Sequence, residues 1–320
     1  MNITGIITEY NPFHLGHLHH LQECKKDTNC DGVICVMSGN FVQRGMPAII
    51  DKWERAKIAV KNGVDLVVEL PLIFSTSSAE TFAYGAVALL EKTRVVNNLY
   101  FGSEHGDVLD LNKIASVIIK EPLEYKNILK KELSKGVPYH YARLTSLKNY
   151  FSDINLEEII SSSNNILGIE YLKALKRHRT HITPLTIKRD YSDYNSEKVK
   201  KGIASATAIR TMVKNNKNVH YVVPYETYEL LDEEINNGRI IKDLSVFEKE
   251  IIYTLRKMTL SEIANLPDVS EGLENRIKMA ANKFNNLNDL ILNIKSKRYT
   301  QSRIQRILLY ALIGISRKRY

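Results

Sequence analysis

Four short apolar runs in the first hundred residues constrain the fold of this chain more than any other feature. They cover residues 3–8, 32–37, 64–70 and 95–101, and segments of helical periodicity at 15–26, 51–62 and 78–92 separate them. Strands that alternate with helices form βαβ units and a parallel sheet. Such sheets bind their ligands at the carboxyl ends of the strands. The sequence therefore predicts an α/β, Rossmann-like fold whose site lies after the strands.

The remainder of the chain changes character. Residues 107–178 have mainly helical patterns, 182–187 form one more strand-like run, and from 247 onward one short helix follows another. A chain of 320 residues that is 44% hydrophobic can bury two cores. We expect an α/β domain over residues 1–220 and an all-helical domain over residues 221–320.

Several observations favour a cytoplasmic location. No apolar run reaches the roughly 18 residues that a membrane span needs, and the first residues lack the basic region of a signal peptide. The odd number of cysteines, Cys24, Cys30 and Cys35, indicates free thiols in a reducing compartment.

The segment His14-Leu15-Gly16-His17 stands where the first strand passes into the first helix. A helix N-terminus offers unpaired N–H groups and partial positive charge to a phosphate. The i, i+3 spacing places both imidazoles on one side of the first turn, where they can donate hydrogen bonds as charge develops at phosphorus. Gly16 leaves room for a nucleotide against the backbone. We predict His14 and His17 as catalytic residues, although two histidines can also simply cap a helix.

Positive charge gathers at the C-terminal end. The net charge is +9, and residues 241–320 contain 15 basic and 8 acidic residues. This excess favours a polyanionic partner such as nucleic acid, with a solvated helix face as the alternative. The candidate contacts are predicted to share one stretch of helical spacing, interleaved with Tyr299 and Tyr310: Lys295, Lys297, Arg298, Arg303 and Arg306.

Other nucleotide and metal motifs are missing. We find no GxxxxGK[ST] loop, no GxGxxG fingerprint and no HExxH. Mg²⁺ is expected with ATP on chemical grounds, but the spacing of the acidic residues does not identify its ligands.

The sequence resembles a known family. HLGH is similar to the HxGH signature of nucleotidyltransferases, and GIITEYNPFHLGHLHH resembles the opening of the bacterial tRNA(Met) cytidine acetate ligases. Further similar segments follow in the same order at residues 38–45, 65–71, 101–104, 164–171 and 205–210. Members of this family tend to continue beyond the position of Tyr320, so part of the RNA-binding surface is expected to be missing if this sequence is a piece of a longer protein.

The resemblance implies an activity. Such enzymes are understood to convert ATP and acetate to acetyl-adenylate and pyrophosphate, and to transfer the acetyl group to the N4 amine of the wobble cytidine of elongator tRNA(Met). The residues implied in ATP binding are Ile7, Thr8, Glu9, Tyr10, Asn11, Pro12, Phe13, His14, Leu15, Gly16, His17, Leu18, His19, His20, Gly102, Asn165 and Arg189.

Residue chemistry agrees with several of these assignments. Gly102 follows a strand and lets an adenosine approach the backbone. Asn165 can recognise the nucleotide or cap a helix, and Arg189 can offer a fork of donors to phosphates or be a surface charge. Residues 205–210 resemble the ISSTxIR phosphate loop of the superfamily, with Ala206 in place of its second serine, so we expect contacts from Ser205, Thr207 and Arg210.

Two other functions fit parts of the sequence. An adenylyltransferase that acts on a small phosphorylated metabolite needs the same HxGH site but no basic helical half. A non-catalytic RNA-binding module on the same fold would bind RNA without ATP turnover.

Overall fold

The computed structural model describes residues 1–137, 139–151, 155–189, 204–296 and 298–317. Its centre is a parallel sheet of five strands in the order β5-β2-β1-β6-β7. The strands are β1 (Ile3–Thr8), β2 (Gly32–Ser38), β5 (Leu66–Leu70), β6 (Val96–Ser103) and β7 (Thr183–Lys188). The predicted α/β fold with a parallel sheet is confirmed.

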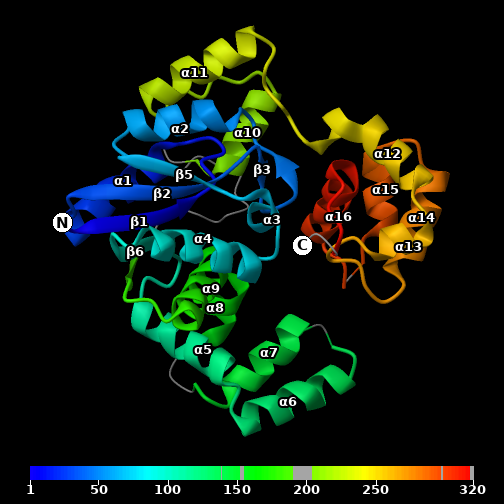
Figure 1. The fold of residues 1–320 in the computed structure, drawn as a ribbon, viewed down its shortest axis with the longest axis horizontal. Helices are drawn as coiled ribbons and strands as arrows, with labels where there is room; N and C mark the ends of the chain where they lie inside the picture. The colour runs from blue at the N-terminus through cyan, green and yellow to red at the C-terminus, as the bar shows by residue number, and fades with distance from the viewer. Residues whose placement is uncertain (138, 152–154, 190–203, 297, 318–320) are drawn as a thin grey trace.

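Helices cover both faces of this sheet (Figure 1). One face packs against α4 (Ala79–Thr93), α5 (Val108–Lys120) and α9 (Ser163–His178), and the other against α1 (Leu15–Thr28), α2 (Lys52–Lys61), α10 (Ala206–Lys214) and α11 (Tyr225–Asn236). The apolar strand residues thus enter two cores, one on each side. Gly168 lets α9 approach the sheet, since a Cβ there would meet the Phe101 ring at 2.6 Å.

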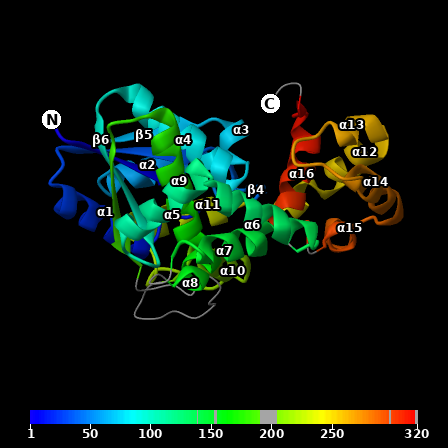
Figure 2. The ribbon, with the colours of Figure 1, turned by 90° about the horizontal axis from the view of Figure 1, so that it is seen from below.

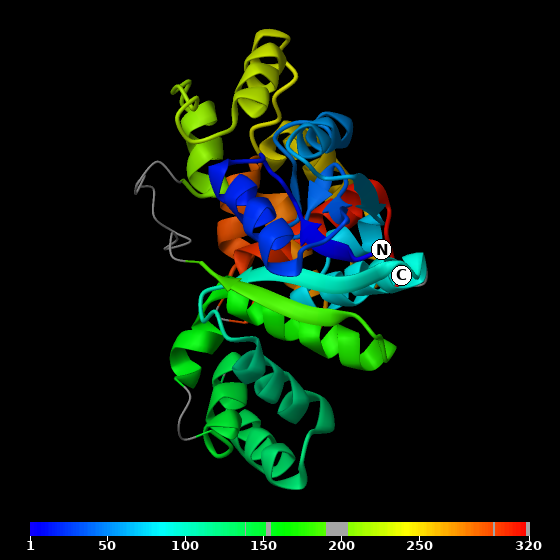
Figure 3. The same ribbon diagram turned by 90° about the vertical axis from the view of Figure 1, so that its left-hand side faces the viewer.

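Short elements complete this part of the chain. A hairpin of two short strands, β3 (Phe41–Val42) and β4 (Met46–Pro47), follows β2, and α3 (Leu72–Ser75) follows β5. Between β6 and α9, the helices α6 (Leu123–Ser134), α7 (Tyr139–Lys148) and α8 (Leu156–Ser161) extend away from the sheet (Figure 3).

A third core belongs to the C-terminal helices, which stand to one side of the sheet (Figure 2). Its buried side chains come from residues between Leu244 and Ala311. The elements are the 3₁₀ turn η1 (Leu244–Phe247), α12 (Glu248–Lys257), α13 (Leu260–Ala264), α14 (Leu273–Lys283), α15 (Leu287–Ile294) and α16 (Gln301–Ile313). Leu231 of α11 packs in a core of the sheet, so the core of the C-terminal helices begins after residue 231. The predicted domain boundary at 220/221 stays a prediction.

Helix α16 ties the C-terminal helices to the α/β part of the chain, at the end of α3 and at the β3–β4 hairpin. The hydroxyl of the fully buried Tyr310 donates to the carbonyl of Thr76 at 2.5 Å. Gly45, at the turn of the β3–β4 hairpin with φ +70°, packs directly against the α16 backbone at Arg306. A side chain at Gly45 would be excluded both by this contact and by the positive φ.

Candidate active site

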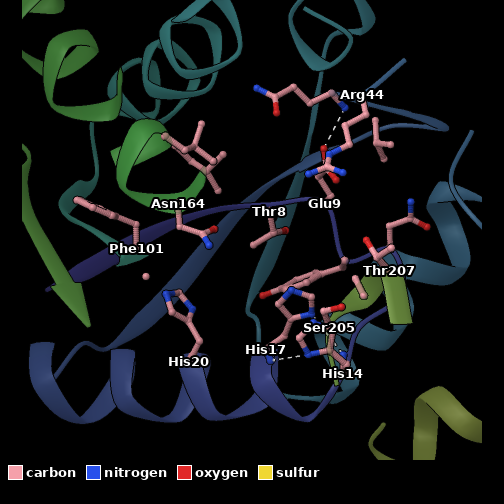
Figure 4. A pocket seen from close by; sticks show the side chains of 18 of the residues that line it. Thr8, Glu9, His14, His17, His20, Arg44, Phe101, Asn164, Ser205 and Thr207 are labelled. Carbon is pink, nitrogen blue, oxygen red and sulfur yellow. Dashed lines mark hydrogen bonds between the residues drawn. The ribbon is translucent and has the colours of Figure 1, made fainter. Parts of the chain in front are cut away.

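The two predicted histidines form the entrance to α1. His14 is the N-cap, and its Nδ1 accepts from the backbone N–H of His17 at 3.3 Å. In return, the Nδ1 of His17 accepts from the backbone N–H of His14, also at 3.3 Å. The two rings stack with centroids 3.6 Å apart (Figure 4). This reciprocal capping box satisfies N–H groups that a helix start otherwise leaves unpaired.

These contacts determine what the rings can donate. Burial lowers the pKa of His14 to about 3, and the nearby Arg189 and Arg210 add to the effect. Burial also lowers the pKa of His17, and that of His20 to about 3. His14 and His17 are therefore neutral, and since each Nδ1 accepts a hydrogen bond, each Nε2 carries the proton. Both rings offer an Nε2–H donor.

A pocket opens at the carboxyl ends of β1 and β6. The chain adds β2 and β5 on one side of β1, and β6 and β7 on the other, so this is the switch point where α/β sheets bind ligands. Most of the predicted site residues line it: Ile7, Thr8, Glu9, Tyr10, Asn11, His14, His17, His20, Gly102, Arg189, Ser205, Thr207 and Arg210. Others do not line it: Pro12, Phe13, Leu15, Gly16, Leu18, His19 and Asn165. Phe13, for example, is fully buried in a core.

Gly102 and Arg189 lie against each other at the ends of β6 and β7. The Arg189 N–H donates to the Ser103 carbonyl at 2.8 Å. A Cβ at Gly102 would lie 3.0 Å from both Cγ and Cδ of Arg189. The space above Gly102, predicted to admit adenosine, is thus used by the Arg189 side chain, which also lines the pocket.

Asn165 lies behind the pocket wall. It is fully buried, its Oδ1 accepts from the His105 N–H at 2.9 Å, and its own N–H donates to Glu104 Oε2 at 2.8 Å. The N-cap of α9 is Ser162, so Asn165 is not the cap that one interpretation assigned to it. Its neighbour Asn164 lines the pocket and donates from Nδ2 to Glu104 Oε1 at 2.7 Å.

The predicted phosphate loop brings a second helix N-terminus to the pocket. Ser205 caps α10 by accepting from the Ala208 N–H at 3.1 Å. Arg210 donates to the Asn11 carbonyl at 2.7 Å and to Thr207 Oγ1 at 3.0 Å. The starts of α1 and α10 therefore face one pocket, and each contributes partial positive charge suited to an anion.

Sequence reasoning missed part of the lining. The β3–β4 hairpin contributes Gln43 and Arg44, with Arg44 near Glu9 in Figure 4, and the Gln43 N–H donates to Glu9 Oε1 at 2.9 Å. Their position directly after the second parallel strand was a usable signal. The other missed lining residues are Val42, Met46, Phe82, Phe101, Asn164, Leu167, Tyr171 and Ala206.

The predicted basic stretch has a different structure from the one expected. Lys295 caps the end of α15 and α16 begins only at Gln301, so the single helical stretch was wrong. Between the two helices in sequence, Tyr299 is buried in the C-terminal core and its hydroxyl donates to the Ser270 carbonyl at 2.9 Å. Lys297 lies outside the described residues.

The four described members of this set divide into two pairs. Lys295 and Arg298 are exposed, and Arg298 forms a surface ion pair with Glu271 at 3.2 Å. Arg303 donates to the Asp268 carbonyl and lies over the Tyr299 ring at 4.7 Å. Arg306 is mostly buried and pairs with the Asp268 carboxylate at 2.9 Å. The second pair stabilises the C-terminal helices internally.

No three His, Cys, Asp or Glu side chains gather into a metal-binding group within the described ranges. Likewise, no helix of the described part of the chain is long and apolar enough to span a membrane.

Known proteins are similar to this chain in sequence and fold. The pattern of the HIGH Nucleotidyl Transferase family matches residues 1–320. The tRNA(Met) cytidine acetate ligase of Clostridium novyi is 48% identical over 320 residues, which cover 98% of this chain and 79% of the relative. That of Acetivibrio thermocellus is 48% identical over 325 residues, covering 99% and 78%. The chain belongs to the tRNA(Met) cytidine acetate ligase family.

A solved structure of a member of the tRNA(Met) cytidine acetate ligase family agrees. Thermotoga maritima TmcAL bound with alpha-thio ATP is 38% identical, with a TM-score of 0.92, over 99% of this chain and 76% of that one. The apo form of the same protein gives a TM-score of 0.95. The resemblance inferred from HLGH and the collinear segments is confirmed.

Proposed function

We propose that this chain is an ATP-dependent tRNA(Met) cytidine acetate ligase, which activates acetate as acetyl-adenylate and transfers the acetyl group to N4 of the wobble cytidine of elongator tRNA(Met). The observation that carries the proposal is the pair of neutral, reciprocally capped histidines at the mouth of a pocket with two helix N-termini. The 48% identity to ligases of that name over nearly the whole chain supports the same substrates.

The first step is displacement at the α-phosphate. An acetate oxygen bonds to the α-phosphorus of ATP, and the bond from that phosphorus to the pyrophosphate oxygen breaks. Negative charge grows on the phosphate oxygens, where the Nε2–H donors of His14 and His17 can stabilise it without being protonated. Arg189 and Arg210, at the same pocket, supply charge for the remaining phosphates.

The second step requires an acceptor. The mixed anhydride reacts with water unless it is shielded, and a bound tRNA both delivers the amine and covers the pocket. Lys295 and Arg298 are the described members of the predicted basic set that are exposed, so we expect them to contact RNA phosphates, with Lys297 between them in sequence. Arg303 and Arg306 support that surface from within rather than contacting RNA first.

Mg²⁺ is part of the proposal only as a companion of ATP, held through phosphate oxygens and water as it commonly is in nucleotide sites. A tRNA substrate also favours a cytoplasmic place of action.

Incubation with ATP, acetate and unmodified tRNA, followed by nucleoside mass spectrometry, tests this function. We expect N4-acetylcytidine that depends on all three components. Transfer of AMP to a phosphorylated metabolite, with acetate inert, would instead indicate the adenylyltransferase. RNA binding without any ATP turnover would indicate the non-catalytic module.

A further inference from the structure

Glu9 differs in charge from the residues that line the pocket around it. Among the described residues that line the pocket, it is the only Asp or Glu, whereas Arg44, Arg189 and Arg210 are cationic. ATP, acetate and RNA phosphates are all anions, so a carboxylate at this position opposes their binding by like-charge repulsion. A carboxylate here therefore suits a partner that donates hydrogen bonds.

The fold holds Glu9 in place from two sides. Its carbonyl accepts from Arg55 at 2.6 Å, and the fully buried Arg55 side chain also donates to the carbonyls of Ile50 and Gly39. Its side-chain Oε1 accepts from the Gln43 N–H at 2.9 Å. These contacts join the ends of β1 and β2 and fix the direction of the carboxylate.

The hairpin that holds Oε1 is itself braced. Gly45, two residues after Gln43, packs against the backbone of α16. In Figure 4, Glu9 is seen on the side of the pocket that carries Arg44, with His14 and His17 on the opposite side. Glu9 and the two histidines thus line opposite sides of one pocket.

Resting on the proposed function, we propose that Glu9 binds the exocyclic amine of the acceptor cytidine and takes up its proton. Carboxylates recognise cytosine by accepting from N4. As N4 attacks the acyl carbon, a C–N bond forms, the bond from that carbon to the AMP oxygen breaks, AMP leaves with the electron pair, and the proton lost by N4 passes to Glu9. Uridine presents O4, an acceptor, and is repelled by the same carboxylate.

The substitution Glu9→Gln tests this role because glutamine preserves the size and the acceptor oxygen for Gln43 but cannot take up a proton. Two half-reactions are measured: acetate-dependent ATP–pyrophosphate exchange without tRNA, and single-turnover transfer from preformed acetyl-adenylate to tRNA. General-base loss costs roughly 10²–10⁴ in rate. We expect transfer to fall at least about 100-fold further than exchange does, and Glu9→Asp to recover part of it.

Two controls complete the design. His14→Ala must depress exchange, which shows that the assay detects damage to adenylation. Wild type should bind tRNA with a wobble cytidine more tightly than tRNA with a wobble uridine. This preference should decrease in Glu9→Gln, since an amide can also donate to O4. Equal losses in both half-reactions, with an altered Mg²⁺ requirement, would assign Glu9 to ATP and its metal and overturn the proposal, as would unimpaired transfer. If the wild type performs neither half-reaction, the proposed function itself fails.

Discussion

His14 and His17 hold each other in place: each imidazole Nδ1 accepts from the other residue's backbone N–H at 3.3 Å, with the rings stacked at 3.6 Å. The same contacts that cap the helix through Nδ1 therefore leave Nε2–H of both rings as hydrogen-bond donors. The two readings of the HxGH segment, cap and phosphate site, are compatible in this structure.

Substitution at His14 can separate these two roles. His14→Ala loses both the cap and the donor, so we expect a loss of about 1 kcal/mol in stability and a fall in adenylate formation of roughly 10²–10³. His14→Asn keeps a good N-cap residue but lacks Nε2–H, so its stability should approach wild type while its activity falls as far. Chemical denaturation and ATP–pyrophosphate exchange measure the two effects. Near-normal turnover by both variants would remove His14 from the mechanism.

Gly102 and Arg189 should behave as one unit. Gly102→Ala puts a Cβ 3.0 Å from the Arg189 side chain and should displace it. We expect Gly102→Ala and Arg189→Ala each to weaken ATP binding, and the double variant to be no worse than the more damaging single variant. Arg189→Lys should rescue poorly because lysine lacks the planar fork. Titration with ATP checks this, and additive losses would show that the two residues act separately.

The buried histidines predict acid sensitivity of the fold. Burial holds the pKa of His14 and His20 at about 3, below the ordinary histidine value of 6.5. As pH falls, the histidines of the unfolded chain therefore take up protons before those of the folded chain. The contribution of the buried histidines to the free energy of unfolding is complete above pH 6.5 and is lost between pH 6.5 and 3. At pH 5 the loss is about 2 kcal/mol per histidine. His14→Asn should lose less stability than wild type between pH 7 and 5 in denaturant titrations; an identical loss would contradict the burial effect.

RNA affinity should depend on exposed rather than on internal basic residues. Lys295→Ala with Arg298→Ala should weaken tRNA binding and reduce its dependence on salt by about one counterion per lost phosphate contact. Lys92→Ala, at an exposed lysine of α4, is the matched control. Arg306→Ala should instead lower stability, since it breaks the pair with Asp268. Binding that is unaffected by salt and by the double substitution would leave these charges as a solvated face.

The sequence predicted the sheet well because its signal is local. Each parallel strand is a short run between helical segments, and β1 lies over the residues expected for it. The β3–β4 hairpin was missed because each strand has only two residues, too few for a periodic pattern. The internal pairing of Arg306 was also beyond reach, since charge counting cannot tell that Asp268 lies beside it. The family resemblance implied Asn165 in ATP binding and did not single out Asn164, and only the three-dimensional turn of α9 decides which one lines the pocket.

The central claim is tested most directly by following labelled acetate. With ATP and elongator tRNA(Met), we expect the label on the wobble cytidine, one AMP and one pyrophosphate released per acetyl group, and no label when that cytidine is replaced by uridine. Label that is absent from the cytidine tRNA, or equally present on the uridine tRNA, would contradict the account.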